Sequence, residues 1–289
     1  MAKLPENTTG IKGIMAACDG EEIISKQRPY LGMSGLGGPC MRSLWYSFHW
    51  VAKKEIPRRV NRIFERGHWE EHRIIRDLSE IGIDFFRRDK DGIAIPITGN
   101  PDEEQERIVG FAGHALGHTD GRCIGVPDAP KTEHLSEFKS ANDKNFKKFQ
   151  KLGVEQSNET YYGQMQRYML GLGLTRALFV VTNKNDESRY YERVSFDKTY
   201  AGDLVKKEQH IVMSEAPLEK IGGPTWFECK WCDKKGVCHE GDAPDRNCRT
   251  CDHSDLENEG KWSCSYHEKE ITTDEQRIGC EFWHKGWGL

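Results

Sequence analysis

Apolar positions between residues 57 and 214 change repeatedly between helical and strand-like spacing. From 60 to 81 they recur every three or four residues, which predicts an amphipathic helix over 57–80. Similar patterns predict helices over 143–152, 157–172 and 198–214. Alternating and continuous apolar runs predict strands near 82–87 and 113–125 and at 133–140, 176–182 and 189–195. This order of elements indicates an α/β domain with a mixed central sheet flanked by helices.

An acidic and a basic residue stand two positions apart on the expected strand 133–140. Because alternate side chains of a strand share a face, Glu137 and Lys139 should project into the same pocket. The segment VPDAPKT contains two prolines and predicts a turn between this strand and the preceding one. Folding the chain at that turn brings Asp120 opposite Glu137 and Lys139.

Asp128 is a competing candidate, because it forms a Pro-Asp pair ahead of the same strand. It falls within the turn, on the order of 20 Å from Glu137 at ~3.3 Å per strand residue. We therefore favour Asp120. A Glu-x-Lys pair on a strand is by itself more often a solvated edge, so the assignment depends on the polar residues that accompany it.

Polar residues interrupt the apolar faces of two expected helices. Glu71 falls on the apolar stripe of helix 57–80, where an unpaired carboxylate is costly and is usually neutralised by a metal or a cation. His72, one position off that stripe, is the reserve candidate. Gln164 lies within the apolar face of helix 157–172, and its alternative role is a core amide bonded to the backbone.

The ordered set of these polar residues resembles the PD-(D/E)XK nuclease superfamily, in its RecB-like and phage exonuclease branch. The set consists of Glu71, Asp120, Glu137, Lys139 and Gln164. In that branch a G-x-x-x-(H/E) helix precedes the core, as Gly67 to Glu71 does here, and a Q-x-x-x-Y helix follows it, as Gln164 to Tyr168 does. The resemblance covers roughly residues 40 to 215 and implies a restriction-endonuclease-like core.

The resemblance also implies an activity, that of a deoxyribonuclease dependent on Mg²⁺ or Mn²⁺. Exonuclease action on DNA ends or single strands is expected, in phage or bacterial recombination, replication or repair. Lys139 would position the nucleophile or stabilise charge, and Gln164, supported by Tyr161 or Tyr168, would orient its neighbours. The implied ligands of the metal are Glu71, Asp120, Glu137 and the carbonyl of Phe138.

Two other functions remain open at this stage. One is a structure-selective endonuclease. The other is a non-catalytic DNA-binding or assembly subunit whose Cys-rich tail recruits a recombination or replication partner. Oligomerisation is compatible with either.

Charge and hydropathy narrow the class of protein. The mean hydropathy is -0.74, no apolar run approaches the ~20 residues needed to span a bilayer, and the first ten residues lack the apolar core of a signal peptide. We expect a cytoplasmic protein without membrane contact, in the host cytoplasm if it is phage-encoded. The net charge of -4 argues against a protein that coats DNA.

Two basic stretches nevertheless adjoin the expected site. Residues 53–66 hold six basic and two acidic residues, and residues 139–151 hold five lysines and one aspartate, so each carries a net charge of +4. Such stretches supply phosphate contacts, although each is equally well explained as a solvated helix face. The candidate DNA contacts are Lys53, Lys54, Arg58, Arg59, Arg62, Arg66, Lys144, Lys147 and Lys148.

Ten cysteines in a chain without a secretory signal point to metal binding rather than to disulfides. Cys229, Cys232 and Cys238 form a C-x2-C-x5-C set that is one thiolate short of four, and Cys40 is the expected fourth ligand. This arrangement of one early and three late cysteines resembles the AddB and CRISPR-associated RecB-like nucleases, and the resemblance implies a 4Fe-4S cluster. Zinc is the alternative, and His239 could replace one cysteine.

A second set is spaced C-x2-C-x12-C-x15-C and fits tetrahedral zinc. It consists of Cys248, Cys251, Cys264 and Cys280, and one of these could be replaced by His253, His267 or His284. Residues 240–289 carry twelve acidic and six basic residues, and this negative charge argues against a DNA-binding surface there. So short and polar a region is expected to need a metal to fold. Cys18 and Cys123 are expected to be free thiols.

The chain is therefore expected to divide into three parts. These are an N-terminal segment (1–39), a nuclease core (40–225) and a Cys-rich metal-binding region (226–289) that contains a zinc-like module at 248–284.

Overall fold

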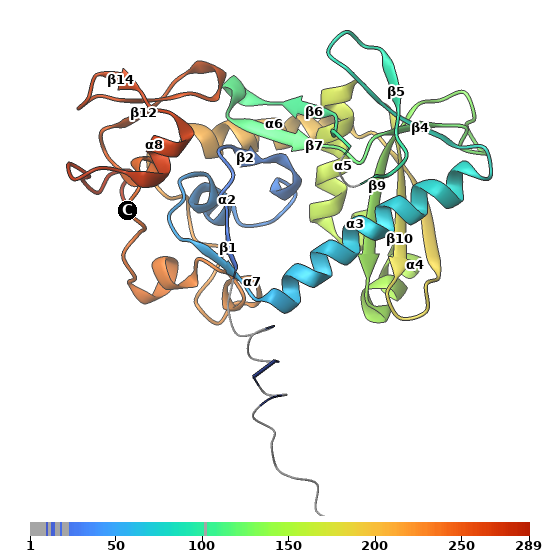
Figure 1. Ribbon diagram of the computed structural model, residues 1–289, viewed down its shortest axis with the longest axis horizontal. Coiled ribbons are helices and arrows are strands. Elements are labelled where there is room, and N and C mark those ends of the chain that lie inside the picture. The colour runs from blue at the N-terminus through green and yellow to red at the C-terminus, as the bar shows by residue number, and fades with distance from the viewer. Residues whose placement is uncertain (1–9, 11–12, 15–17, 19–22, 101–102) are drawn as a thin grey trace, which may run out of the picture.

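A mixed six-stranded sheet forms the centre of the protein (Figure 1). The computed structural model describes residues 10, 13, 14, 18, 23–100 and 103–289, and the side chains at 23–25 and 54 lie outside that description. The strand order is β11-β10-β9-β8-β4-β5, in which β9 and β10 are parallel and the other neighbours antiparallel. The strands are β4 (Asp84–Arg88), β5 (Ala94–Pro96), β8 (Arg122–Ile124), β9 (His134–Ala141), β10 (Arg176–Asn183) and β11 (Arg189–Ser195). The predicted α/β class with a mixed sheet is confirmed.

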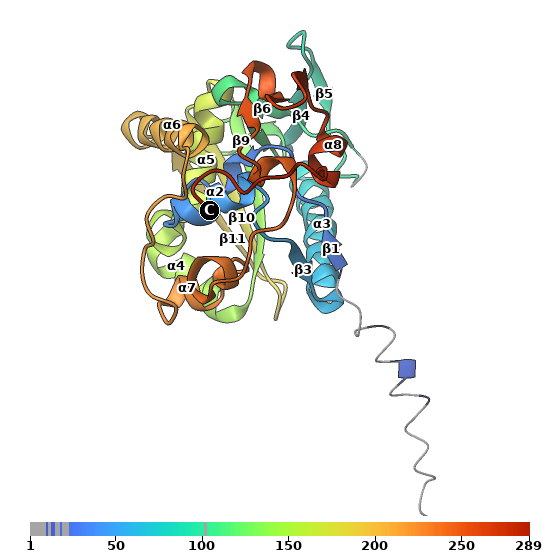
Figure 2. The same ribbon diagram turned by 90° about the vertical axis from the view of Figure 1, so that its left-hand side faces the viewer.

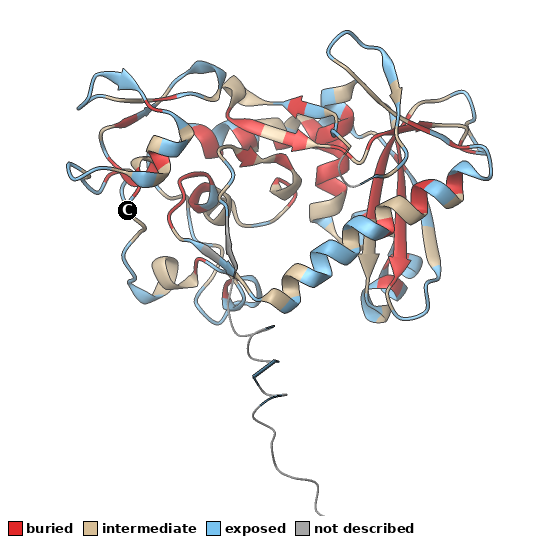
Figure 3. Cartoon of the chain, in the orientation of Figure 1, coloured by how far each residue is buried: buried red, intermediate tan, exposed pale blue. Residues whose placement is uncertain are grey.

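Helices cover both faces of this sheet. The long ones are α2 (Met41–Phe48), α3 (Arg58–Ser79), α4 (Asp143–Ser157), α5 (Glu159–Leu172) and α6 (Lys198–Met213). Helix α3 packs Ile74 against Phe138 and Val180 on one face, whereas α4 and α5 cover Phe179 and its neighbours on the other. Successive residues of β9 and β10 thus enter two different cores, so both strands are largely buried (Figure 3). Of the described helices, none is long and apolar enough to cross a membrane.

The helix ends follow local chemistry. Asn142, Asn158 and Asp197 cap α4, α5 and α6, because each side chain accepts a hydrogen bond from a backbone N–H three residues later. Gly153 has a φ of 72° inside α4, so the regular helix is interrupted where the sequence predicts its end. Gly173 ends α5 in the left-handed conformation that favours glycine.

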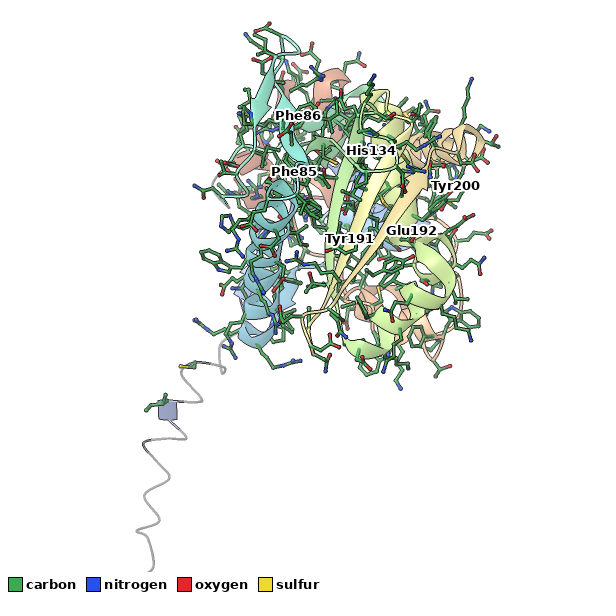
Figure 4. All side chains as sticks on the ribbon, turned by 90° about the vertical axis from the view of Figure 1, so that its right-hand side faces the viewer. Phe85, Phe86, His134, Tyr191, Glu192 and Tyr200 are labelled. Carbon is green, nitrogen blue, oxygen red and sulfur yellow. The ribbon has the colours of Figure 1, made fainter. Side chains whose placement is uncertain are left out.

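Strand β11 forms one edge of the sheet, where Tyr191 and Glu192 lie (Figure 4). The Glu192 carboxylate accepts hydrogen bonds from the backbone N–H of Val154 (2.8 Å) and from the Tyr190 hydroxyl (2.9 Å). These bonds hold the end of α4 against the edge strand.

The strand predicted near 113–125 is in fact two strands in two sheets. The chain bends at Gly121, whose φ of +111° suits glycine, and a Cβ there would lie 2.5 Å from Ile97. Before the bend, β7 joins a small second sheet of order β2-β7-β6, and after it β8 joins the large sheet. The strands of the small sheet are β2 (Leu31–Gly32), β6 (Arg107–Val109) and β7 (Ala115–His118).

The remaining elements are short. Strands β1 (Ile23–Ser25) and β3 (Lys54–Ile56) pair with each other ahead of α3. The Cys-rich region contains α7 (Phe227–Lys230), β12 (Ser254–Leu256), β13 (Trp262–Cys264), β14 (Lys269–Glu270) and α8 (Thr273–Ile278), and its three strands form one antiparallel sheet.

The Cys-rich region lies against α2 (Figure 2), and a buried cation, Arg249, contacts both. The Arg249 guanidinium is 1% exposed and lies 4.2 Å from the Trp50 ring centroid and 4.6 Å from that of Trp262. It donates hydrogen bonds to the carbonyls of Phe48 (3.0 Å) and Pro29 (2.8 Å). Trp262 belongs to the same hydrophobic cluster as Phe48, so apolar packing is continuous across the expected boundary at residue 226. The division into three parts stays a prediction.

We expect Arg249→Ala to destabilise the protein by about 3 kcal/mol or more. The change removes charged hydrogen bonds and leaves two buried carbonyl groups without the donor that they have in the wild type. Urea unfolding measures the loss, and limited proteolysis should show earlier cleavage of residues 249–289. Lys285→Ala, an exposed cation in the same region, is the control. Equal stability of the two variants would contradict this role of Arg249.

Candidate active site

Strand β9 continues past the end of its antiparallel neighbour β8. The register pairs Arg122 with Leu135, and the last backbone bond on this edge runs from the Ser136 N–H to the Gly121 carbonyl (2.9 Å). The next N–H on the same edge, that of Phe138, donates to the Asp120 carboxylate (2.9 Å). Because the N–H and C=O of one strand residue point to the same edge, the Phe138 carbonyl is also directed to the side of Asp120.

Glu137 and Lys139 lie on one face of β9, as predicted, and form an ion pair. The Glu137 side chain is fully buried, and its second oxygen accepts a hydrogen bond from Gln164 Nε2 (3.0 Å). The Lys139 ammonium lies 5.3 Å from the Tyr161 ring centroid. Helix α5 therefore holds both members of the pair in place from the face of the sheet that it covers.

Tyr168 is buried beside the carboxyl groups, with Gly117 against its ring; a Cβ at Gly117 would lie 2.5 Å from that ring. Burial, followed by the charges of Glu137 and Asp120, raises the pKa of Tyr168 well above its ordinary value. The hydroxyl therefore stays protonated and can donate a hydrogen bond.

Helix α3 carries a third carboxylate, Glu71, whose charge interacts with those of Asp120, Glu137 and Lys139. The prediction that Glu71 lies on the buried stripe is corrected, because Glu70 is the buried residue (4% exposed) and Glu71 flanks the stripe. Ile74 is a fully buried residue of the stripe and serves as the reference. At ~100° per residue, Glu70 lies about 40° from Ile74 around the helix axis, and Glu71 lies about 60° from Ile74 in the opposite direction. Both side chains line the groove that runs along α3, and the charge of Glu71 interacts with those of Asp120 and Glu137.

Glu70 was missed by the sequence analysis. It faces the groove and accepts a hydrogen bond from Arg73 (2.9 Å), and its other oxygen is buried with no hydrogen-bond partner. The reserve candidate His72 instead packs near Gly99 and is not among the described residues that line the groove.

The site concentrates negative charge. Burial, and then the charge of Asp120, raises the pKa of Glu71 to about 8. Burial likewise raises the pKa of Glu137 to about 7, against the opposing effect of Lys139, and it raises the pKa of Asp120. Three carboxylates beside one ammonium would leave a net charge of -2 when ionised. A divalent cation with oxygen ligands would neutralise that charge, so the donor set fits Mg²⁺.

The competing residue Asp128 lies elsewhere. Its side chain is 81% exposed in the turn, and its nearest charged partner is Arg193 on β11 at 3.8 Å. The structure therefore brings Asp120, rather than Asp128, to the Glu137–Lys139 pair.

A groove of about 1030 Å³ runs along α3 and reaches the site. Glu71, Phe138 and Lys139 line it at the site. The other cations that line it are Lys26, Arg28, Lys184 and Lys234. None of these four was selected from the sequence, because they lie outside the basic stretches and come together only when distant segments fold around α3.

The nine predicted DNA contacts are not among the described residues that line this groove. Lys53, Arg59, Arg62 and Arg66 are exposed, and the Lys54 side chain lies outside the described residues. Lys144, Lys147 and Lys148 are exposed on α4, on the face of the sheet opposite α3. The expectation that this second stretch adjoins the site is therefore corrected, apart from Lys139, while DNA binding by the nine residues stays a prediction.

The first cysteine set gathers around a cavity of about 260 Å³ lined by Cys40, Cys229, Cys232 and Cys238. Cys40 caps α2, where its sulfur accepts a hydrogen bond from the Ser43 N–H (3.4 Å). Burial raises the pKa of Cys40, and its neighbours Cys232 and Cys238 raise it further. Residues about 190 positions apart in the chain are therefore close enough to repel one another as thiolates.

The second set gathers around a cavity of about 160 Å³ lined by Cys248, Cys251, Cys264 and Cys280. Burial and the three neighbouring thiols raise the pKa of Cys248 to about 11. A bound cation would reverse such shifts, because it stabilises thiolates.

Neither set is already arranged around a metal. Among the described residues, no three His, Cys, Asp or Glu side chains stand together in a geometry that holds a metal ion, and this includes the carboxyl groups of Glu71, Asp120 and Glu137. Several thiols instead contact the backbone, as Cys248 does at the Glu275 carbonyl (3.6 Å) and Cys251 at the His284 N–H (3.5 Å). The cysteines of each predicted set thus line one cavity, and metal ligation stays a prediction. Cys18 is exposed and Cys123 buried, and neither lines these two cavities.

No protein-family model and no curated protein matches this sequence. Among solved structures, the chain is similar to LHK-Exo, an alkaline exonuclease from Laribacter hongkongensis, at 17% identity over 64% of this chain and 87% of that one, with a TM-score of 0.44. A structure of LHK-Exo in complex with dAMP gives 16% identity, 64% and 86% coverage and the same TM-score. SSO0001 is similar at 12% identity over 74% of this chain and 87% of that one, with a TM-score of 0.38.

Replacing Glu71 should stabilise the metal-free protein at alkaline pH. Its folded-state pKa of about 8 exceeds the ordinary 4.5, so ionisation opposes folding increasingly as the pH rises from about 5 to about 8. Glu71→Gln removes this penalty, with a gain on the order of 1 kcal/mol or more at pH 8 and little gain at pH 5. Urea unfolding at both pH values without added divalent metal provides the measurement.

The matched control is Glu65→Gln, an exposed carboxylate on the same helix. It should show no pH-dependent gain. An equal gain at pH 5 and pH 8 for Glu71→Gln would argue against a raised pKa.

Proposed function

We propose that this protein is a metal-dependent deoxyribonuclease that acts as an exonuclease on DNA ends or single strands. One observation carries the proposal. Three carboxyl groups, a lysine and a backbone carbonyl converge at the open edge of β9, beside a groove large enough for a nucleic-acid strand. The exonuclease preference comes from the sequence resemblance, and a role in recombination, replication or repair follows from the same source.

Glu71, Asp120, Glu137 and the carbonyl of Phe138 would hold Mg²⁺ or Mn²⁺. Such a metal, when bound, polarises the phosphodiester and makes a water molecule more acidic. The ligands come from α3, the bend after β7 and strand β9, so their convergence requires the complete fold.

Lys139 would act on the substrate directly. Lys139 lines the groove and its side chain is 22% exposed, whereas that of its partner Glu137 is fully buried. Although burial lowers the pKa of Lys139, Glu137 and Asp120 raise it above the ordinary value, so the side chain stays charged and can donate hydrogen bonds to a phosphate oxygen or to the attacking water.

Gln164 and Tyr168 would act as positioning residues. The Gln164 amide fixes one Glu137 oxygen, which leaves the other beside Lys139. Tyr168 fills the space behind the carboxyl groups and excludes water there. Both are buried on α5, so their positions are set before any substrate binds.

We further propose that the first cysteine set holds a 4Fe-4S cluster and the second a zinc ion. The first set joins α2 to the segment after α6, and its cavity is the larger of the two. The second set lies within 33 consecutive residues, as is common for zinc modules. Four thiolates suit either metal centre, so the assignment rests on the resemblance for the first set and on compactness for the second.

We expect Glu137→Gln or Lys139→Ala to reduce Mg²⁺-dependent cleavage by about 100-fold or more, because each removes charge that stabilises the transition state. Release of nucleotides from an end-labelled strand measures this, with circular dichroism to confirm folding. Asp128→Ala is the control and should remain active. If Asp128→Ala is inactive while Asp120→Ala is active, the assignment of Asp120 is wrong. Cleavage of a closed circular DNA would favour an endonuclease.

Anaerobically purified protein should be brown and contain about four irons and one zinc per chain. Cys40→Ala should lose the iron and Cys264→Ala only the zinc, because each removes one ligand of a different set. Metal analysis and the visible spectrum measure both, and Cys18→Ala, an exposed thiol outside the sets, should keep both metals. A colourless protein with two zinc ions would refute the cluster while leaving the nuclease proposal standing.

A further inference from the structure

The first half of α3 presents apolar side chains to the groove instead of to a protein core. Phe64 is 48% exposed and Ile63 is 38% exposed, and both line the groove together with Ile56. Tyr30 and Leu44 line it as well. Apolar residues are therefore interspersed with the groove cations Lys26, Arg28 and Lys184 along one channel.

This mixture of surfaces suits unpaired bases. A duplex presents its sugars and phosphates outward and keeps the faces of its bases stacked inside, so an aromatic groove gains little from it. A single strand exposes base faces, which stack on aromatic side chains while cations neutralise the phosphates. We propose that the groove binds single-stranded DNA, with a base stacked on Phe64 and the backbone passing Lys184 to reach the acidic site. This inference rests on the proposed function and narrows its substrate to single strands.

The position of Phe64 relative to the site sets a length scale. Phe64 and Glu71 are seven residues apart on one helix, which is ~10 Å at ~1.5 Å per residue. A stacked strand advances ~3.4 Å per nucleotide, so the base on Phe64 would lie about three nucleotides from the phosphate at the acidic site. His68 lies between them on the same side of the helix and lines the groove.

A second set of exposed aromatic residues lies in the segment that leads to the groove residue Asp233. Trp231 is 75% exposed, and the Lys230 ammonium lies 5.2 Å from its ring centroid. Two and three residues later, Asp233 and Lys234 line the groove itself. Phe227, also 75% exposed, belongs to the same segment. An exposed indole with an adjacent cation is a stacking surface for a further base as the strand enters.

The test compares aromatic residues that share a helix and differ in their position relative to the groove. Phe64→Ala and Trp231→Ala remove proposed stacking surfaces. Trp69→Ala is the matched control, because Trp69 is 61% exposed on α3 and is not among the residues lining the groove. Binding of a labelled 20-nucleotide single strand and of a 20-base-pair duplex is measured by fluorescence anisotropy without added divalent metal, and again in a Glu137→Gln background.

We expect Phe64→Ala to weaken single-strand binding by about tenfold, Trp231→Ala to weaken it by a smaller factor, and Trp69→Ala to leave it unchanged. Duplex binding should be weaker than single-strand binding and insensitive to all three changes. A series of strands, each lacking one base at a different position, should locate the nucleotide that stacks on Phe64. When the missing base lies about three nucleotides from the cleaved bond, Phe64→Ala should weaken binding no further, because the stacking contact is already lost.

A second pair of variants tests the path of the backbone. Lys184→Ala should reduce the salt dependence of binding by about one unit of slope, because it removes one phosphate contact. Lys206→Ala, an exposed lysine on α6 outside the groove and outside the predicted DNA contacts, should leave the slope unchanged.

Three results would overturn the proposal: equal effects of Phe64→Ala and Trp69→Ala, equal weakening of single-strand and duplex binding, or tighter binding of the duplex. The proposed function fails separately. If the wild-type protein binds single strands through Phe64 but cleaves no DNA with Mg²⁺ or Mn²⁺, the groove assignment survives and the nuclease does not. If it cleaves DNA without any dependence on Phe64, the reverse holds.

Discussion

The arrangement of the site depends on one feature, the continuation of β9 beyond β8. A strand edge without a neighbouring strand leaves backbone groups that must find other partners, and here the Asp120 carboxylate accepts the Phe138 N–H. The same opening admits Glu71 from α3 to the edge. Had β8 continued alongside β9, its backbone would occupy the place of both carboxylates, and Glu137 would face a closed sheet.

Burial of Glu137 is tolerated because its partners are supplied from two directions. Lys139 provides the opposite charge on the same strand, and Gln164 provides a hydrogen bond from α5. Removing one member of such a buried pair leaves an uncompensated charge, which is more costly than the pair itself. The excess negative charge that remains with Asp120 and Glu71 is what favours a bound divalent cation.

The groove and the first cysteine cavity share a wall. Gly35, Leu44, Asp233 and Lys234 line both of them. A metal centre at these cysteines would therefore fix one side of the groove without touching the acidic site. Farther along the chain, Arg249 connects α2 to the C-terminal residues through carbonyl and aromatic contacts, so the Cys-rich region supports the fold around the groove as well as its own sheet.

Local pattern was enough to predict β9, β10, β11 and the helices around them, because their apolar spacing and caps act within a few residues. It was enough, too, to place Glu137 beside Lys139 and to group the late cysteines by spacing, whereas Cys40 was added to the first set through the family resemblance. It did not predict the bend at Gly121, the burial of Glu70 in place of Glu71, or the cations Lys184 and Lys234 in the groove. Those features arise from the docking of segments far apart in the chain, where side-chain packing and the angle of α3 across the sheet decide which residues face one another.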